Sequence, residues 1–328
     1  MGKMITNYIG HELQLYGVRE MRLAGGKADG MRLLSVKNGK GLAFEVSLDR
    51  CGDISLLSLK GDNMGYFSPC GYVSPKYYDN KGDGFLKSFT GGFFTTCGLT
   101  AVGTPCTDNG EDLPLHGTIS HTPCEAFRYF IQDGALHIEL TVRDAALFSH
   151  HLVLEREYVC PLDKNEIRMT DRIKNTGPRS TPLEVLYHCN MGYPLLSEHA
   201  RITVPSSAVA ARDEHAKEGM EACLVMEKPQ RGYVEKCYYH TLSGKTCVSV
   251  YNGDIKKGVR IQYDAESLPY FTEWKLMGER EYVLGLEPGN CLPDGRSAMR
   301  EKGILEILEP GQERTFQITF EFVEEELC

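Results

Sequence analysis

The feature that most constrains the fold is an alternation of apolar and polar residues that recurs in short segments along the chain. Residues 136–142 read LHIELTV and residues 316–322 read FQITFEF. Successive side chains of a β-strand point to opposite faces, so this period of two predicts strands with one buried face. We expect further strands at 42–48, 125–132, 150–160, 165–175, 182–190, 233–241, 246–252, 258–264, 270–276 and 282–287.

Turn residues punctuate these segments, as in QDG, PLDKN, KNTGP, LSGK, NGD and EPGQ. The one helix that we expect is short, around residues 208–220, and nowhere do long helical patterns alternate with strands. This pattern argues against a doubly wound parallel sheet and predicts a large all-β antiparallel sandwich. The sequence contains no linker, low-complexity segment or repeat, so we expect one domain over residues 1–328.

The composition of the chain limits the classes of partner that it can bind. Charged residues make up 25% of the chain and hydrophobic residues 41%, which is ordinary for a globular protein. The net charge of −9 and the lack of a basic run argue against nucleic acid as a partner. No apolar stretch is long enough to cross a membrane, and the N-terminus lacks a signal-peptide core, so we expect no membrane partner and a cytoplasmic protein.

The twelve cysteines stand singly, without a CxxC pair. Paired spacing is what signals a zinc ribbon or a redox couple. We therefore expect most of these cysteines to be reduced residues packed in the core or in strands.

The stretch of greatest interest is PLEVLYHCNMGYPLL at residues 182–196. Its alternation places Tyr187 and Cys189 on one face of a strand, and His188 and Asn190 on the other. A strand that buries one face and presents an imidazole and an amide on the other suits a concave site. The alternative is an edge strand whose polar face is merely solvated.

Other polar clusters are candidates for the same site. They are His116 in LPLHGTISHTP, His240 beside Tyr238 in EKCYYHT, and the run LPYFTEWKLMGEREYVLGLEPGN, which contains Trp274 and Glu287. Val283, Gly285 and Glu287 share a strand face, so we expect open space for a ligand beside the carboxylate. An aromatic face beside polar groups is a common way to hold a sugar ring. Taken singly, each could also be a structural histidine, a surface carboxylate or a core tryptophan.

Residues 61–98 are rich in Gly, Tyr and Phe and show little periodicity. We expect an ordered excursion over the top of a sheet, because its aromatic content argues against disorder. Ordered excursions of this length inside compact domains are usually functional.

Taken together, the motifs resemble the aldose 1-epimerase (galactose mutarotase) superfamily, and most closely an uncharacterised branch known as a domain of unknown function. The wider resemblance rests on the His-Gly at 116, the strand histidine at 188 and the Glu-Pro at 287. The closer one rests on LDRCGDISLLSLKG, SPCGYVSPKYY, GFLKSFTGGFFTTCGL, LPLHGTISHTP, LYHCNMGYPLL, LPYFTEWK and YVLGLEPGN. These pieces span roughly residues 48 to 290.

The resemblance implies a β-supersandwich with a sugar in a groove, and no cofactor or metal. It implies that His188 is the general acid, that Glu287 is the general base, and that His116 binds the sugar near its ring oxygen. His240 falls about where many relatives have an aspartate that binds hydroxyls, and Thr118 stands where relatives of this branch tend to have arginine. We expect the remaining lining to be Arg50, Asp53, Asn190, Trp274 and Lys275. A small-molecule sugar is the partner implied, with a homodimer as one option.

The implied reaction is the interconversion of sugar anomers, with Thr118 and the negative charge favouring a free sugar over a sugar phosphate. Two alternatives stay open: a sugar-binding protein without turnover, and a different isomerase with a metal held by His116, His188, His240 and Glu287. Side chains converging within about 2.0–2.2 Å of one point would indicate a metal. A gap the size of a pyranose between His188 and Glu287 would indicate acid–base chemistry.

Overall fold

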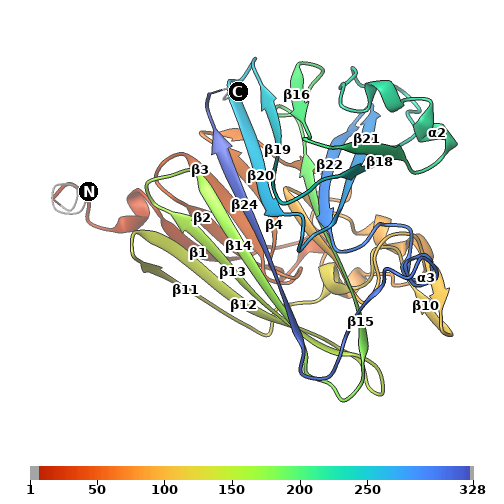
Figure 1. Cartoon of the computed structure of the whole chain (residues 1–328). Coiled ribbons are helices and arrows are strands. Elements are labelled where there is room, and N and C mark those ends of the chain that lie inside the picture. Colours follow the sequence, from red (N-terminus) through yellow and green to blue (C-terminus); the bar gives the residue numbers. More distant parts are fainter. Residues whose placement is uncertain (1–6, 326–328) are drawn as a thin grey trace.

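The computed structural model describes residues 7–325, and its architecture is all-β. Figure 1 shows the eight-stranded sheet, with β12, β13 and β14, on one side and the seven-stranded sheet, with β18, β21 and β22, on the other. Neighbouring strands within these sheets run antiparallel. The predicted large antiparallel sandwich is confirmed.

The eight-stranded sheet follows the predicted segments closely. Its order is β11 (Ala126–Gln132), β12 (Ala135–Ala145), β13 (His151–Pro161), β14 (Glu166–Asn175), β24 (Glu313–Val323), β20 (Lys257–Asp264), β19 (Lys245–Asn252) and β16 (Ala200–Thr203). A five-stranded sheet precedes it in the chain: β1 (Gly17–Arg22), β2 (Arg32–Lys37), β3 (Leu42–Ser47), β4 (Asp53–Leu59) and β5 (Asp62–Asn63).

The seven-stranded sheet is the one that carries the candidate site. Its order is β17 (Ala208–Ala211), β18 (Lys236–Thr241), β21 (Tyr270–Gly278), β22 (Glu281–Gly289), β15 (Thr181–Met191) and β23 (Glu306–Leu308), with β8 (Phe94–Leu99) also paired to β15. Two small ribbons join β6 (Tyr66–Phe67) to β7 (Gly91–Gly92) and β9 (Cys106–Asp108) to β10 (Glu111–Leu113).

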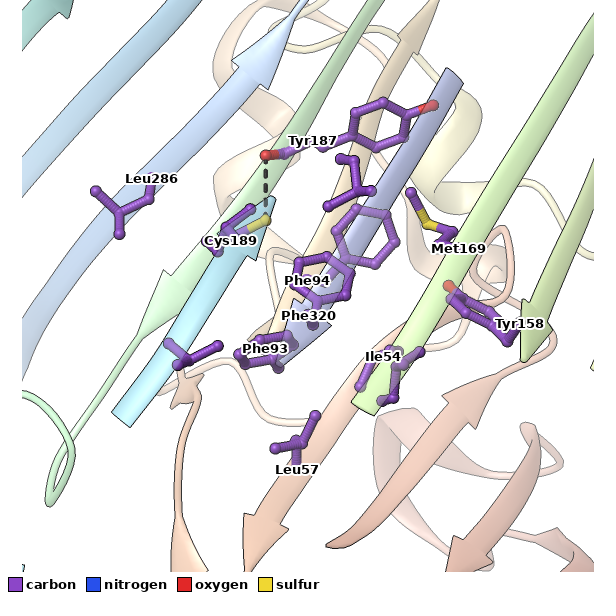
Figure 2. Close-up of a cluster of buried hydrophobic side chains, with 14 of the residues drawn as sticks. Ile54, Leu57, Phe93, Phe94, Tyr158, Met169, Tyr187, Cys189, Leu286 and Phe320 are labelled. Atoms are coloured by element: carbon purple, nitrogen blue, oxygen red, sulfur yellow. Dashed lines mark hydrogen bonds between the residues drawn. The ribbon is translucent and has the colours of Figure 1, made fainter. Parts of the chain in front are cut away.

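One large core fills the space between the sheets. Figure 2 shows side chains from several strands meeting there: Ile54 and Leu57 of β4, Phe94 of β8, Tyr158 of β13, Met169 of β14, Tyr187 and Cys189 of β15, Leu286 of β22 and Phe320 of β24. Burying apolar surface of this kind is the main favourable term in folding.

Helices are few and short among the described residues. They are α2 (Glu214–Lys217), α3 (Arg296–Glu301) and the 3₁₀ turns η1 (Glu12–Gln14), η2 (Gly26–Ala28), η3 (Pro75–Tyr77), η4 (Gly82–Lys87), η5 (Ile119–His121) and η6 (Met220–Ala222). The short helix expected around 208–220 is present but is limited to α2, and α3 was not expected. Residues 208–211 pair with β18 as a strand, and α2 begins only after Asp213, whose carboxylate accepts a hydrogen bond from the backbone N–H of Ala216.

Strand β8 lies in the aperiodic excursion, where no strand was expected. All six of its residues are buried, so its sequence shows no alternation. Of the eleven cysteines in the described part of the chain, most are buried and all are free, as expected, while Cys328 lies outside it. No helix within residues 7–325 is long and apolar enough to cross a membrane.

Candidate active site

Strand β15 has one face in the core and the other face toward the candidate site. Tyr187 and Cys189 point into the main core, while His188 and Asn190 lie on the opposite face, as the alternation predicted. The strand is paired with β8 on one side and β22 on the other, so the edge-strand alternative is wrong. A fully paired strand gives His188 a rigid backbone.

Antiparallel register aligns three reactive groups in one row across the sheet. The pairs Leu186–Gly289 and Cys189–Leu286 place His188 opposite Glu287, and Glu287 in turn pairs with Thr272 of β21. Cross-strand neighbours of this kind have their Cβ atoms about 4.5–5.5 Å apart. His188, Glu287 and Thr272 therefore form one row on one face of the sheet, which we call the reactive row. It carries an imidazole, a carboxyl group and a hydroxyl in that order.

A glycine shapes the adjacent row. Gly285 pairs with Asn190 on one side and with Trp274 on the other. A Cβ atom at Gly285 would lie 2.3 Å from Glu287 Oε1 and 3.0 Å from Trp274 Cβ. The open space expected beside Glu287 is thus filled by its own carboxyl group and by the tryptophan.

A cavity of about 340 Å³ opens above these rows. Ligand pockets run from about 300 to 1,000 Å³, so this one suits a small ligand such as a single sugar ring. It is lined by Asp83, Phe85, Leu86, Phe89, Gly103, Thr104, Pro105, Leu115, His116, His188, Arg212, Glu235, Cys237, Thr272, Trp274, Glu287 and Pro293. Four of the predicted site residues are brought together here: His116, His188, Trp274 and Glu287.

Aromatic rings surround the reactive row. The His188 ring lies 5.2 Å from Trp274 and 5.4 Å from Phe89, measured between centroids. Phe85 packs 5.2 Å from His116 in the same way. Phe85 and Phe89 come from the 61–98 excursion, whose predicted functional role agrees with this position.

The central contact joins His188 to Glu287. His188 Nε2 lies 3.2 Å from Glu287 Oε1, and both side chains are almost fully buried. The two atoms are close but not aligned for a hydrogen bond, so Glu287 Oε1 has no hydrogen-bond partner among residues 7–325. The other imidazole nitrogen, His188 Nδ1, also has no partner among these residues. The gap of pyranose size between the two residues, which would have indicated acid–base chemistry, is absent.

Burial acts on both groups in the direction of neutrality. It lowers the pKa of His188 to about 3, with His116 adding repulsion to any charge there. It raises the pKa of Glu287 well above its usual value, and Glu235 adds to this effect. Both shifts favour the neutral forms, a neutral imidazole and a protonated carboxyl group.

His116 enters the cavity from the loop after β10. Its φ is +57°, and the following Gly117 has φ +70°, where a Cβ would lie 2.4 Å from the carbonyl oxygens of Gly98 and Ala101. The glycine of the His-Gly motif is therefore required by close backbone packing. His116 Nδ1 has no partner within residues 7–325, and burial lowers the pKa of His116 to about 4.

Arg212 and Glu235 were not expected in the site. Arg212 Nη2 donates to Glu235 Oε1 at 3.3 Å, and Trp274 Nε1 donates to Glu235 Oε2 at 2.6 Å. Both residues stand at strand ends: Arg212 lies just after β17, and Glu235 lies just before β18. Glu235 is the first residue of the EKCYYHT stretch, but only Tyr238 and His240 of that stretch were singled out. Only the tertiary fold brings them to the cavity.

Arg50 and Asp53 lie away from the cavity lining. Arg50 donates to the carbonyl oxygens of Val73 and Ser88, and so anchors the 61–98 excursion. Asp53 is ion-paired at 3.0 Å with the buried Arg156. Both are structural in the positions that they occupy.

His240 and Lys275 lie on the opposite face of the sheet. Trp274 and Cys237 line the cavity, so the strand period sends Lys275 and His240 the other way. His240 Nε2 lies 2.9 Å from Glu273 Oε2, and Lys275 Nζ lies 2.9 Å from Glu227 Oε2.

Asn190 shares the face of His188 but lies outside the lining. Its side-chain amide donates to the backbone carbonyl of His188 at 2.9 Å. The four ligands of the metal alternative do not converge, because His240 is on the other face. Within residues 7–325 no three His, Cys, Asp or Glu side chains are arranged to hold a metal ion.

The sequence profile of one protein family, the domain of unknown function DUF4432, matches residues 28–322. The chain belongs to this family. No protein of curated function matches the chain.

Solved structures show what this member of DUF4432 is similar to. A protein from Klebsiella pneumoniae described as a "putative aldose 1-epimerase" has a TM-score of 0.89 at 25% identity, over 96% of this chain and 86% of that one. A galactose mutarotase-like protein from Clostridium acetobutylicum has a TM-score of 0.68 at 12% identity, over 94% and 99%. Galactose 1-epimerase from Lactobacillus acidophilus has a TM-score of 0.62 at 13% identity, over 95% and 100%. The galactose mutarotase-like β-supersandwich fold is thereby confirmed.

Proposed function

We propose that this protein binds a free aldose in the cavity above β15, β21 and β22 and interconverts its anomers by general acid–base catalysis. The observation that carries this is the His188–Glu287 contact of 3.2 Å at the base of a cavity walled by aromatic rings. A buried imidazole and a buried carboxyl group, side by side and lacking hydrogen-bond partners within residues 7–325, suit proton exchange with a ligand.

The close approach of the two side chains fits the chemistry. The ring oxygen and the anomeric hydroxyl of an aldose are bonded to the same carbon, C1. An acid that serves one and a base that serves the other can therefore stand beside each other. This is why the contact supports the reaction although the gap of pyranose size is absent.

The two residues share one proton. In the productive complex sugar hydroxyls donate hydrogen bonds to Glu287, which favour its carboxylate and leave the proton on His188. His188 then protonates the ring oxygen while Glu287 removes the proton of the anomeric hydroxyl, and the ring opens to the aldehyde. After rotation about C1–C2, the reverse transfers close the ring on the other face and restore both residues.

The lining favours a sugar without a phosphate group. Arg212 is the one cationic side chain among the lining residues and is already paired with Glu235. Asp83, Glu235 and Glu287 bring carboxyl groups to the same cavity. We place the activity in the cytoplasm, as expected from the sequence, because free thiols such as Cys237 persist in a reducing compartment.

Replacing the acid and the base tests the proposal. We expect Glu287→Gln and His188→Asn each to lower anomer exchange by about 10²–10⁴, because an amide neither donates nor accepts a proton usefully near neutral pH. Sugar binding should stay within about tenfold, or about 1.4 kcal/mol, because shape and some hydrogen bonds survive. Exchange is measured by saturation-transfer NMR with a panel of aldoses, uronates and deoxy sugars.

The controls separate the alternatives. Wild-type exchange rates in either variant would contradict the assignment of acid and base. Binding without exchange in the unmodified protein would identify a sugar-binding protein instead.

A further inference from the structure

The third member of the reactive row, Thr272, has no role in the proposed chemistry. It pairs directly with Glu287, on the side away from His188. The residue is 1% exposed, and its side chain lines the cavity. Its hydroxyl oxygen, Oγ1, has no hydrogen-bond partner among residues 7–325.

A buried hydroxyl without a partner is costly. Leaving such a group unpaired costs about 1–3 kcal/mol, so folded proteins rarely keep one without a reason. A partner from outside the protein would remove this cost. Because Thr272 faces the same cavity as Glu287, a ligand bound there can supply this partner.

The order of the row matches the order of oxygens along one edge of an aldose. The ring oxygen and the anomeric hydroxyl are both on C1, and the next carbon in the ring is C2. With the ring oxygen at His188 and the anomeric hydroxyl at Glu287, the substituent on C2 falls at Thr272. His116, whose ring lies 5.7 Å from that of His188, marks the ring-oxygen end.

We infer that Thr272 binds the 2-hydroxyl of the sugar, so that the protein selects aldoses with a hydroxyl on C2 over their 2-deoxy counterparts. This inference rests on the proposed function, since it uses the positions of His188 and Glu287 relative to C1. Thr272 is a specificity residue, and proton transfer does not pass through it.

A cycle of two proteins and two sugars tests the inference. Exchange is measured for D-glucose and 2-deoxy-D-glucose with the wild type and with Thr272→Val, which keeps the shape and removes the hydroxyl. A neutral hydrogen bond contributes about 0.5–1.5 kcal/mol, which corresponds to a preference of about two- to tenfold in kcat/KM. We expect Thr272→Val to lose this factor on D-glucose and to change 2-deoxy-D-glucose by less than twofold.

Two control variants make the result specific. Thr272→Ser keeps a hydroxyl and should restore most of the preference. Thr246→Val removes a buried hydroxyl of β19 in the other sheet and should leave both sugars unchanged. Thermal unfolding checks that each variant is folded. We expect Thr272→Val to fold normally, because valine has the shape of threonine and the hydroxyl that it removes has no partner within the protein.

The outcomes are separable. Equal loss on both sugars in Thr272→Val, or no loss on either, overturns the role of Thr272 while leaving the acid–base chemistry intact. If the wild type exchanges no sugar of the wider panel, the proposed function fails, and this inference falls with it.

Discussion

At the scale of single residues, Glu287 is the group whose burial has the clearest consequence for the proposed chemistry. Its carboxyl group is buried, and Oε1 has no hydrogen-bond partner among residues 7–325. Burial raises the pKa of Glu287 well above 4.5, the value of a glutamate in water, so the folded protein keeps a proton that the unfolded chain releases above that pH. Stability must therefore fall as pH rises from about 4.5 through the pKa of the folded state.

This predicts that Glu287→Gln stabilises the protein at alkaline pH. Glutamine resembles the protonated carboxyl group and cannot ionise, so the variant lacks the loss just described. We expect the free energy of unfolding to increase by on the order of 1–3 kcal/mol at pH 8 and to be unchanged near pH 4. Urea unfolding across this range measures it, with Glu281→Gln, an exposed change on the same strand, as the control. A gain that does not depend on pH would contradict the prediction.

The site residues that the sequence predicted correctly are those placed by the alternation of side chains along a strand. This alternation correctly put His188 and Asn190 on the face opposite Tyr187 and Cys189. Applied to β21, it also shows that Trp274 and Lys275 cannot both line one cavity. Arg212 and Glu235 could not be predicted, because their approach depends on the pairing of strands distant in sequence.

At the scale of the element, β22 depends on a glycine that leaves room for a neighbour's side chain. Gly285 has no need of left-handed backbone geometry, and its lack of a Cβ lets the Glu287 carboxyl group lie across it. The strand thereby directs the carboxyl group toward His188.

We predict that Gly285→Ala displaces the Glu287 carboxyl group and lowers anomer exchange at least tenfold. The protein should still fold, because the atom nearest to the new methyl group, at 2.3 Å, is the far end of the Glu287 side chain, and Trp274 at 3.0 Å needs to shift only slightly. Exchange by NMR and thermal unfolding measure the two effects. Gly253→Ala, where a Cβ would meet nothing within 4 Å, is the matched control and should leave exchange unchanged. Full activity in Gly285→Ala would show that the carboxyl position is not critical.

The longer strands of the two large sheets could be predicted from alternation, and two of the missed strands, β8 and β17, show why others could not. β8 is buried on both faces, and its sequence, FTTCGL, shows no alternation of apolar and polar residues. β17 is four residues long and rich in alanine, which favours helix, but its pairing with β18 decides the outcome. In both cases tertiary contacts override the local signal.

At the scale of the whole molecule, a buried arginine connects three parts of the fold. Arg156 on β13 is 1% exposed and lies 2.6 Å from Asp171 on β14 and 3.0 Å from Asp53 on β4. Arg156 Nη2 also donates to Thr96 Oγ1 on β8. Burial raises the pKa of Asp53 to about 6 despite this arginine. The general sandwich could be predicted from sequence, but this network could not, because its members are far apart in the chain.

We predict that Arg156→Met lowers the free energy of unfolding by about 3–5 kcal/mol at pH 8, because it leaves two buried carboxylates without a cation. The loss should shrink toward pH 5, where Asp53 takes up a proton and its charge no longer opposes burial. Chemical unfolding at both pH values measures this, with Arg172→Met, an exposed change on β14, as the control. A loss equal at both pH values would argue that packing dominates.

The single tryptophan gives the molecule a built-in optical reporter. Trp274 is the only one in the chain, and its indole forms part of the cavity wall within 2.6 Å of the Glu235 carboxylate. Indole emission thus reports on this cavity alone and carries no direct signal from the eight-stranded sheet. An unfolding curve followed by tryptophan emission describes the site, and circular dichroism must be recorded beside it to describe the whole chain.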